Sequence, residues 1–118
     1  MVTKYKIAIP VYELNLHVAI YEDMARATKD YSKHLDGFSL DNDDGCTFPI
    51  HRGKDLFDDF CIIFYKAKLS HNLIAHETFH VARRILLCRG IQDEEAQAWL
   101  CGWLTGEIYK RLEKDKLI

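Results

Sequence analysis

Two histidines and a glutamate stand close together in the stretch IAHETFHVARR, which covers residues 74–84. His76 and His80 are four residues apart, and on a helix this spacing stacks them one turn above each other. Both imidazoles can then reach one metal ion, at about 2.0–2.1 Å from each nitrogen. Glu77 is rotated by about 100° from His76, which places its carboxylate beside that point. The pattern predicts a zinc site in which Glu77 is the general base for a zinc-activated water.

The alternative is that the three side chains coincide on a solvated face of a helix. The rest of the segment argues for the metal, because its other side is apolar and the histidines and Glu77 form its only strongly polar early stripe. The apolar positions are Ile74, Phe79, Val81, Ala82, Ile85 and Leu86. We therefore expect a core helix that carries a metal-binding stripe.

A catalytic zinc site needs three protein ligands and one open position, so a third ligand must come from elsewhere. The next expected helix has a stripe of small residues along which another helix can approach closely: Ala98, Gly102 and Gly106. At 100° per residue, the direction of this stripe lies within about 20° of Glu95 and about 80° from Glu94. Glu95 is the expected third ligand, and Glu94 is the alternative.

The connection between the two helices constrains this assignment. In a simple antiparallel hairpin that turns at Gly90, His80 lies opposite Cys101, and Glu95 lies well beyond it. Residues 87–94 must therefore fold back alongside the first helix if Glu95 is to reach the metal, and their extended length allows this.

Further side chains could assist hydrolysis, although each is also a common surface or core residue. Tyr109, His51 and His34 are possible donors to a developing oxyanion. Arg83 and Arg84 follow His80 by three and four residues, so that one of them could bind a substrate carboxylate just past the zinc.

The elements that must position these residues follow from hydrophobic periodicity and from turn signals. Strands are expected near 4–11, 15–21 and 59–66, with an edge strand at CTFPI, because Pro49 cannot donate to a central ladder. Helices are expected near 22–35, 70–88 and 93–114, and Trp99 and Trp103 should be mostly buried on the last of them. The predicted fold is α+β: a small, mostly antiparallel sheet of about four strands with three helices, zincin-like, forming a single domain over residues 1–118.

Composition excludes several classes of partner. The 16 basic and 18 acidic residues give a formal net charge of −2, without a basic field for nucleic acid. No stretch approaches 18 apolar residues in a row, so that we expect no membrane segment and a cytoplasmic location. The four cysteines lack C-x-x-C spacing and are expected to be free thiols, with Cys61 and Cys101 buried. Nothing indicates an oligomeric state.

The sequence HETFH followed by DEEAQAWLCGWLTGEIY resembles the gluzincin zinc metallopeptidases, in which an H-E-x-x-H helix is followed by a glutamate on a later helix. It is most similar to the small H-E-x-x-H proteins encoded by phages of Bacteroidetes and related gut bacteria. The similarity covers residues 70–109. It implies zinc bound by His76, His80 and Glu95, Glu77 as the catalytic base, a peptide or protein substrate and, for a phage protein, the host cytoplasm.

Two other classes of function compete with a peptidase. A zincin-like zinc-binding protein could engage a host protein without hydrolysis, and the small size favours this class, since 118 residues leave little chain for a second wall of a cleft. A metal-free α+β interaction module would require the histidine pair to be accidental. The presence of Glu77 favours the enzyme, because a structural zinc site does not need a base.

Overall fold

The computed structural model describes all residues from 1 to 118 and has an α+β fold, as predicted. Contacts cluster into two compact units, residues 1–69 and residues 70–118. The first unit holds a four-stranded sheet with a short helix, and the second holds two long helices. The assignment of one domain to the whole chain stays a prediction.

The sheet of the first unit has the strand order β1-β2-β4-β3. β1 and β2 form an antiparallel hairpin, β4 and β3 also pair antiparallel, and the central pair β2 and β4 is parallel. The strands are β1 (Val2–Ile9), β2 (Leu14–Tyr21), β3 (Gly45–Ile50) and β4 (Asp59–Tyr65). The predicted mostly antiparallel sheet of about four strands is thus confirmed.

Sequence composition explains which strands are central. β4 is apolar on both of its faces and its residues from Asp59 to Phe64 are all buried, which is typical of a strand with neighbours on both sides. β3 contains Pro49, which lacks an N–H, and it lies at the edge of the sheet, as predicted.

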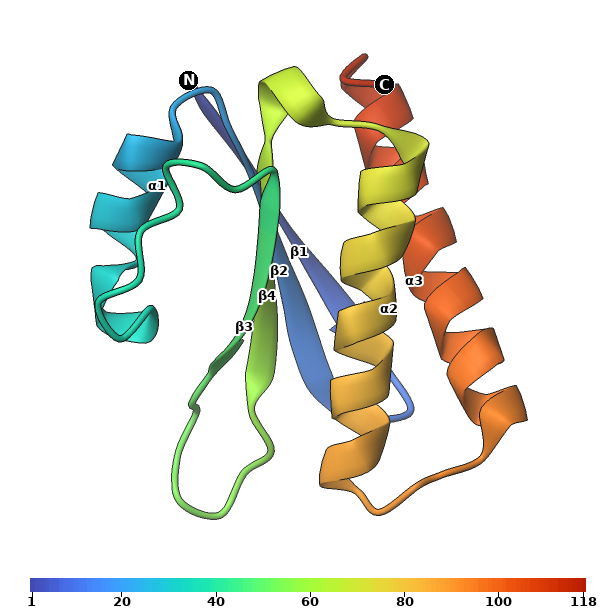
Figure 1. Cartoon of the computed structure of the whole chain (residues 1–118). Helices are drawn as coiled ribbons and strands as arrows, with labels where there is room; N and C mark the ends of the chain where they lie inside the picture. The colour runs from blue at the N-terminus through green and yellow to red at the C-terminus, as the bar shows by residue number, and fades with distance from the viewer. The chain divides into compact units, whose positions relative to one another are not determined.

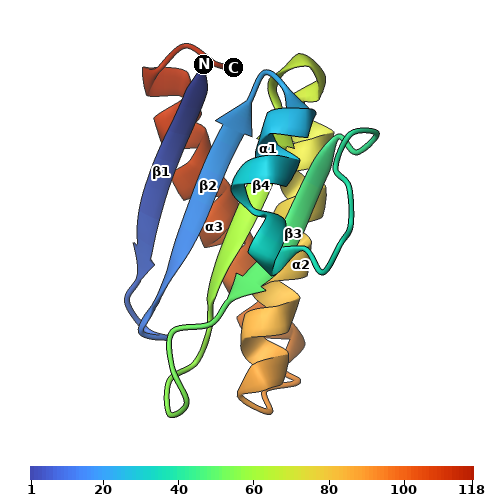
Figure 2. The same cartoon turned by 90° about the vertical axis from the view of Figure 1, so that its left-hand side faces the viewer.

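A short helix, α1 (Met24–Asp30), lies over one face of this sheet (Figure 2). Met24 and Ala27 pack there into a cluster of buried side chains from the strands. The helix was predicted to reach residue 35, but it ends at Asp30, because Tyr31 leaves the helical region at φ −112° and ψ 19°. A 3₁₀ turn, Ser32–His34, completes the segment.

In the second unit, α2 (His71–Cys88) and α3 (Glu94–Lys114) run antiparallel and pack against each other (Figure 1). Each begins at a side-chain cap: Ser70 accepts the N–H of Leu73, and Asp93 accepts the N–H of Glu95. Both helices match the predicted ranges within one residue. Neither they nor α1 is long and apolar enough to cross a membrane.

For three residues on these helices the prediction of a buried side chain is wrong. Trp99 is 56% exposed, Trp103 is half-buried and Phe79 is 45% exposed. The buried side of α3 repeats every four residues, at Leu100, Leu104, Ile108 and Leu112. Trp99 and Trp103 each precede one of these leucines and are therefore rotated by about 100° away from the buried side. The two indole rings stack on each other instead, with centroids 6.3 Å apart.

All four cysteines are free, as predicted. Cys61 is fully buried in β4, but Cys101 is only half-buried.

Candidate metal centre

The candidate site lies on α2, and the local sequence makes that helix regular. The Ser70 cap fixes its start, and residues 71–88 contain neither glycine nor proline, so that the hydrogen-bond ladder continues without a kink. Residues four apart therefore stack, and this regularity is what brings the rings of His76 and His80 together.

The two imidazoles have the spacing that a metal ion requires. Their Nε2 atoms are 3.2 Å apart, and the ring planes are nearly perpendicular, at 84°, with centroids 4.7 Å apart. If each nitrogen lies about 2.05 Å from an ion, the 3.2 Å separation gives an N–metal–N angle of about 103°, close to the tetrahedral angle of about 109°. The pair therefore fits zinc. The same separation also suits an N–H···N hydrogen bond between the rings, with the donor set by the tautomer.

Glu77 completes the group. Its Oε2 lies 3.7 Å from Nε2 of His76, and one ligand atom from each of the three residues falls within 4.8 Å of the others. Glu77 is only 5% exposed, whereas the His76 side chain is 63% exposed. The site thus combines a carboxylate shielded from solvent with an imidazole that molecules in solution can approach. This carboxylate could take a proton from a water beside the histidines, or it could bind the ion itself.

Glu95, the expected third ligand, does not join this group. It lies in the exposed first turn of α3. Glu94 lines the groove between α2 and α3 together with Phe79, Cys101 and Thr105. Phe79 is thus the α2 residue that lines this groove, and His80 is rotated from Phe79 by about 100° around the helix. The structure supplies the two histidines and Glu77, and the role of Glu95 as a ligand stays a prediction.

The three possible oxyanion donors are all engaged with other residues. Tyr109 on α3 hydrogen-bonds His71 at the start of α2, and the two rings stack at 5.0 Å. In the first unit, His51 contacts Asp58 at 2.8 Å, and His34 stacks on Phe48. Only Tyr109 belongs to the same unit as the histidine pair. Its hydroxyl would have to leave His71 before it could serve a substrate.

A buried carboxylate in the first unit was missed by the sequence analysis. Asp59 is 6% exposed, and its Oδ1 accepts the backbone N–H of Asn15 at 2.9 Å. It also contacts His17 at 3.1 Å and Arg52 at 3.2 Å. Arg52 in turn donates to the backbone oxygen of Glu13, so that Asp59 ties the loop before β4 to the β1–β2 turn. The sequence feature that could have indicated this buried carboxylate is an aspartate at the first position of an otherwise apolar strand.

No model of a known protein family matches the chain, and neither a curated protein nor a solved structure shows significant similarity to it.

Proposed function

We propose that the chain is a zinc-dependent peptidase in which His76 and His80 bind the metal and Glu77 is the general base. The observation that carries the proposal is the 3.2 Å separation of the two Nε2 atoms with the Glu77 carboxylate 3.7 Å from one of them. Two imidazole ligands are common to many hydrolytic zinc sites, and a carboxylate beside them can act as the general base.

In this proposal the two histidines hold the metal and Glu77 moves a proton. Zinc, when bound, supplies Lewis acidity, which polarises a peptide carbonyl and lowers the pKa of water. His76 and His80 fix its position from consecutive turns of one helix. Glu77 accepts the proton of the attacking water and passes it to the amine that leaves, and its shielding from solvent keeps the carboxylate free of competing water.

A second candidate function is a zinc-binding protein that engages a protein partner without hydrolysis. Two observations favour it: no carboxylate from α3 joins the group, and the side chain of His76 is mostly exposed rather than placed in a cleft. If the partner supplies the third ligand, zinc would be held at the interface, and Glu77 would serve only to bind or orient.

The substitution Glu77→Gln separates these two functions. In the peptidase it removes the base while preserving size, so that zinc stays bound and cleavage of a diverse peptide mixture falls by roughly 10²–10⁴-fold. Glu113→Gln, an exposed glutamate on α3, is the matched control and should cleave like the parent. Zinc content is measured for all three proteins. A zinc-loaded parent that cleaves nothing, even with bacterial lysate added, would reject the peptidase in favour of the binding protein.

A further inference from the structure

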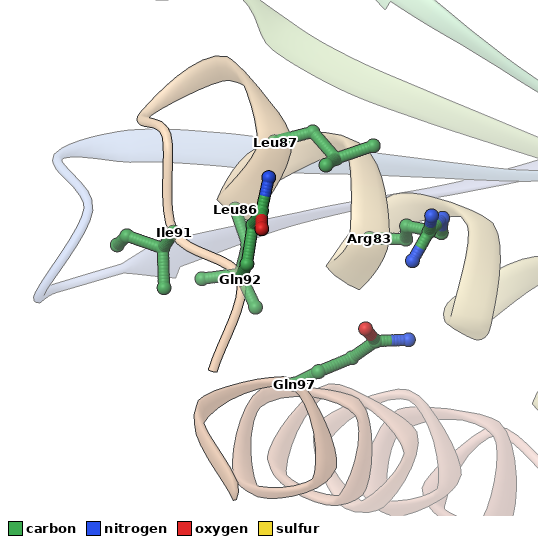
Figure 3. Close-up of a pocket in the computed structure, with 6 residues that line it drawn as sticks. All are labelled: Arg83, Leu86, Leu87, Ile91, Gln92 and Gln97. Atoms are coloured by element: carbon green, nitrogen blue, oxygen red, sulfur yellow. The ribbon is translucent and has the colours of Figure 1, made fainter. Parts of the chain in front are cut away.

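A cavity of about 350 Å³ opens at one end of the helical pair, within the second unit. Figure 3 shows its walls, which come from the last turns of α2, the connecting segment and the first turns of α3. The lining residues are Arg83, Leu86, Leu87, Ile91, Gln92 and Gln97. One cation, two amides and three aliphatic side chains thus surround one space.

The guanidinium of Arg83 makes no hydrogen bond or ion pair in the structure, whereas those of Arg89 and Arg111 donate to backbone oxygens of their own helices. Its guanidinium and the amide of Gln97 extend toward the same side of the cavity from opposite helices (Figure 3). No acidic residue lines the cavity. A guanidinium binds a carboxylate through two parallel N–H···O bonds, so that a ligand with a free carboxylate would supply the partner that Arg83 lacks.

The apolar wall of the cavity is held by a Schellman motif at the end of α2. Gly90 adopts φ 69°, its N–H donates to the oxygen of Leu87, and the N–H of Ile91 donates to the oxygen of Leu86. These bonds fix the half-buried Ile91 near the buried Leu86, while Leu87 is 47% exposed. The wall is therefore preformed, and an aliphatic or aromatic side chain would suit it.

The cavity continues the stripe of α2 that carries the histidines. His76, His80, Arg83 and Leu87 follow at intervals of four, three and four residues, which places them on one side of the helix. Arg83 lies about 4.5 Å beyond His80 along the axis, at about 1.5 Å per residue. One extended residue of a peptide spans roughly 3.3–3.6 Å. A carboxylate one residue beyond a carbonyl at the histidines would therefore reach Arg83.

We propose that this cavity binds the C-terminal residue of a peptide. Arg83 binds the free carboxylate of that residue, and the apolar side chain of the residue packs against Leu86, Leu87 and Ile91. The inference rests on the proposed peptidase function and names its substrate class: peptides that end in an apolar residue with a free C-terminus. The last C–N peptide bond breaks, the oxygen of water goes to the carbonyl carbon, and a proton goes to the amine of the released residue. One amino acid leaves per turnover.

Binding can be tested on the full chain without metal or cleavage. N-acetyl-L-leucine is titrated into ¹⁵N-labelled protein, and N-acetyl-L-leucinamide, which lacks the charge, is the matched ligand. The acid should shift the amide signals of residues 83–97 and bind roughly tenfold more tightly than the amide. Arg83→Gln should remove this preference, and Arg84→Gln, which removes the same charge one residue later, should keep it. Equal binding of acid and amide to the parent would overturn the inference.

A cleavage assay distinguishes failure of the cavity from failure of the proposed function. Peptides that end in leucine are offered to the zinc-loaded parent with either a free or an amidated C-terminus. Release of leucine from the free acid at least tenfold faster than any cleavage of the amide supports the cavity. Equal cleavage of both retains the peptidase and rejects the cavity. Acid-selective binding without cleavage of either retains the cavity and rejects the peptidase.

Discussion

Zinc should stabilise the folded chain through the histidine pair, and replacing one histidine should abolish most of that effect. The 3.2 Å separation of the Nε2 atoms means that the helix already holds both ligands near the tetrahedral angle, so that little reorganisation opposes binding. Zinc at about 100 times its Kd stabilises the folded state by about 2.7 kcal/mol. In His80→Gln, a loss of about 100-fold in affinity brings the same zinc concentration to the Kd, where about 0.4 kcal/mol remains.

These free energies convert to a difference in melting temperature. For a chain of 118 residues, 1 kcal/mol corresponds to roughly 3–5 °C, so that zinc should raise the Tm of the parent by about 10 °C and that of His80→Gln by about 2 °C.

Circular dichroism melts with and without zinc measure both shifts, and zinc content after dialysis should be about one ion per parent chain. His51→Gln is the control, because His51 is an exposed histidine of the other unit, and it should behave as the parent does. An equal zinc shift in parent and His80→Gln would refute the assignment of the metal to the histidine pair, as would a parent that zinc does not stabilise.

Three further predictions concern Asp59, the cysteine thiols and the dependence of stability on pH. Asp59→Asn should lower the free energy of unfolding by about 2 kcal/mol, because the carboxylate contacts a backbone N–H, His17 and Arg52. Urea titrations measure this change, and an unchanged midpoint would contradict the prediction. At pH 8 a disulfide reagent should modify the exposed Cys88 but not Cys61, since burial raises the pKa of the Cys61 thiol to about 12. Burial likewise raises the pKa of Tyr31 to about 12. The unfolded chain loses these protons first, near pH 8.5 and pH 10, so the contribution of these two groups to stability should be constant below about pH 8.5 and fall up to pH 12. Melts at pH 8 and pH 10.5 would show the fall.

Much of the secondary structure could be predicted because its signals are local. Ser70 and Asp93 as caps, and Gly90 after α2, mark helix ends through side-chain and backbone chemistry within a few residues. Pro49 placed β3 at the edge for a similar reason, since a missing N–H cannot serve a central ladder. The parallel pairing of β2 with β4 was not predicted, because it joins segments about 40 residues apart through backbone groups that every sequence possesses.

The candidate site likewise has features that local sequence determined and features that tertiary packing decided. The sequence by itself determined that His76 and His80 stack, because a helix without breakers always brings residues four apart to one side. Which side of α2 meets α3 was decided by tertiary packing, and there the small-residue stripe on α3 was misleading: Phe79 lines the shared groove, and Glu95 does not join the histidines.

The shielding of Glu77 and the cavity at Arg83 also required the tertiary structure. A glutamate on a helix is exposed or buried according to what packs around it, which periodicity alone does not fix. The cavity depends on the Schellman turn at Gly90 and on the start of α3 beside the end of α2, so that its walls come from segments whose spacing is set only when the helices pack. The sequence determined the helices and the stacking of His76 on His80 through local geometry. The packing of α2 against α3 determined which further residues can lie beside the two histidines.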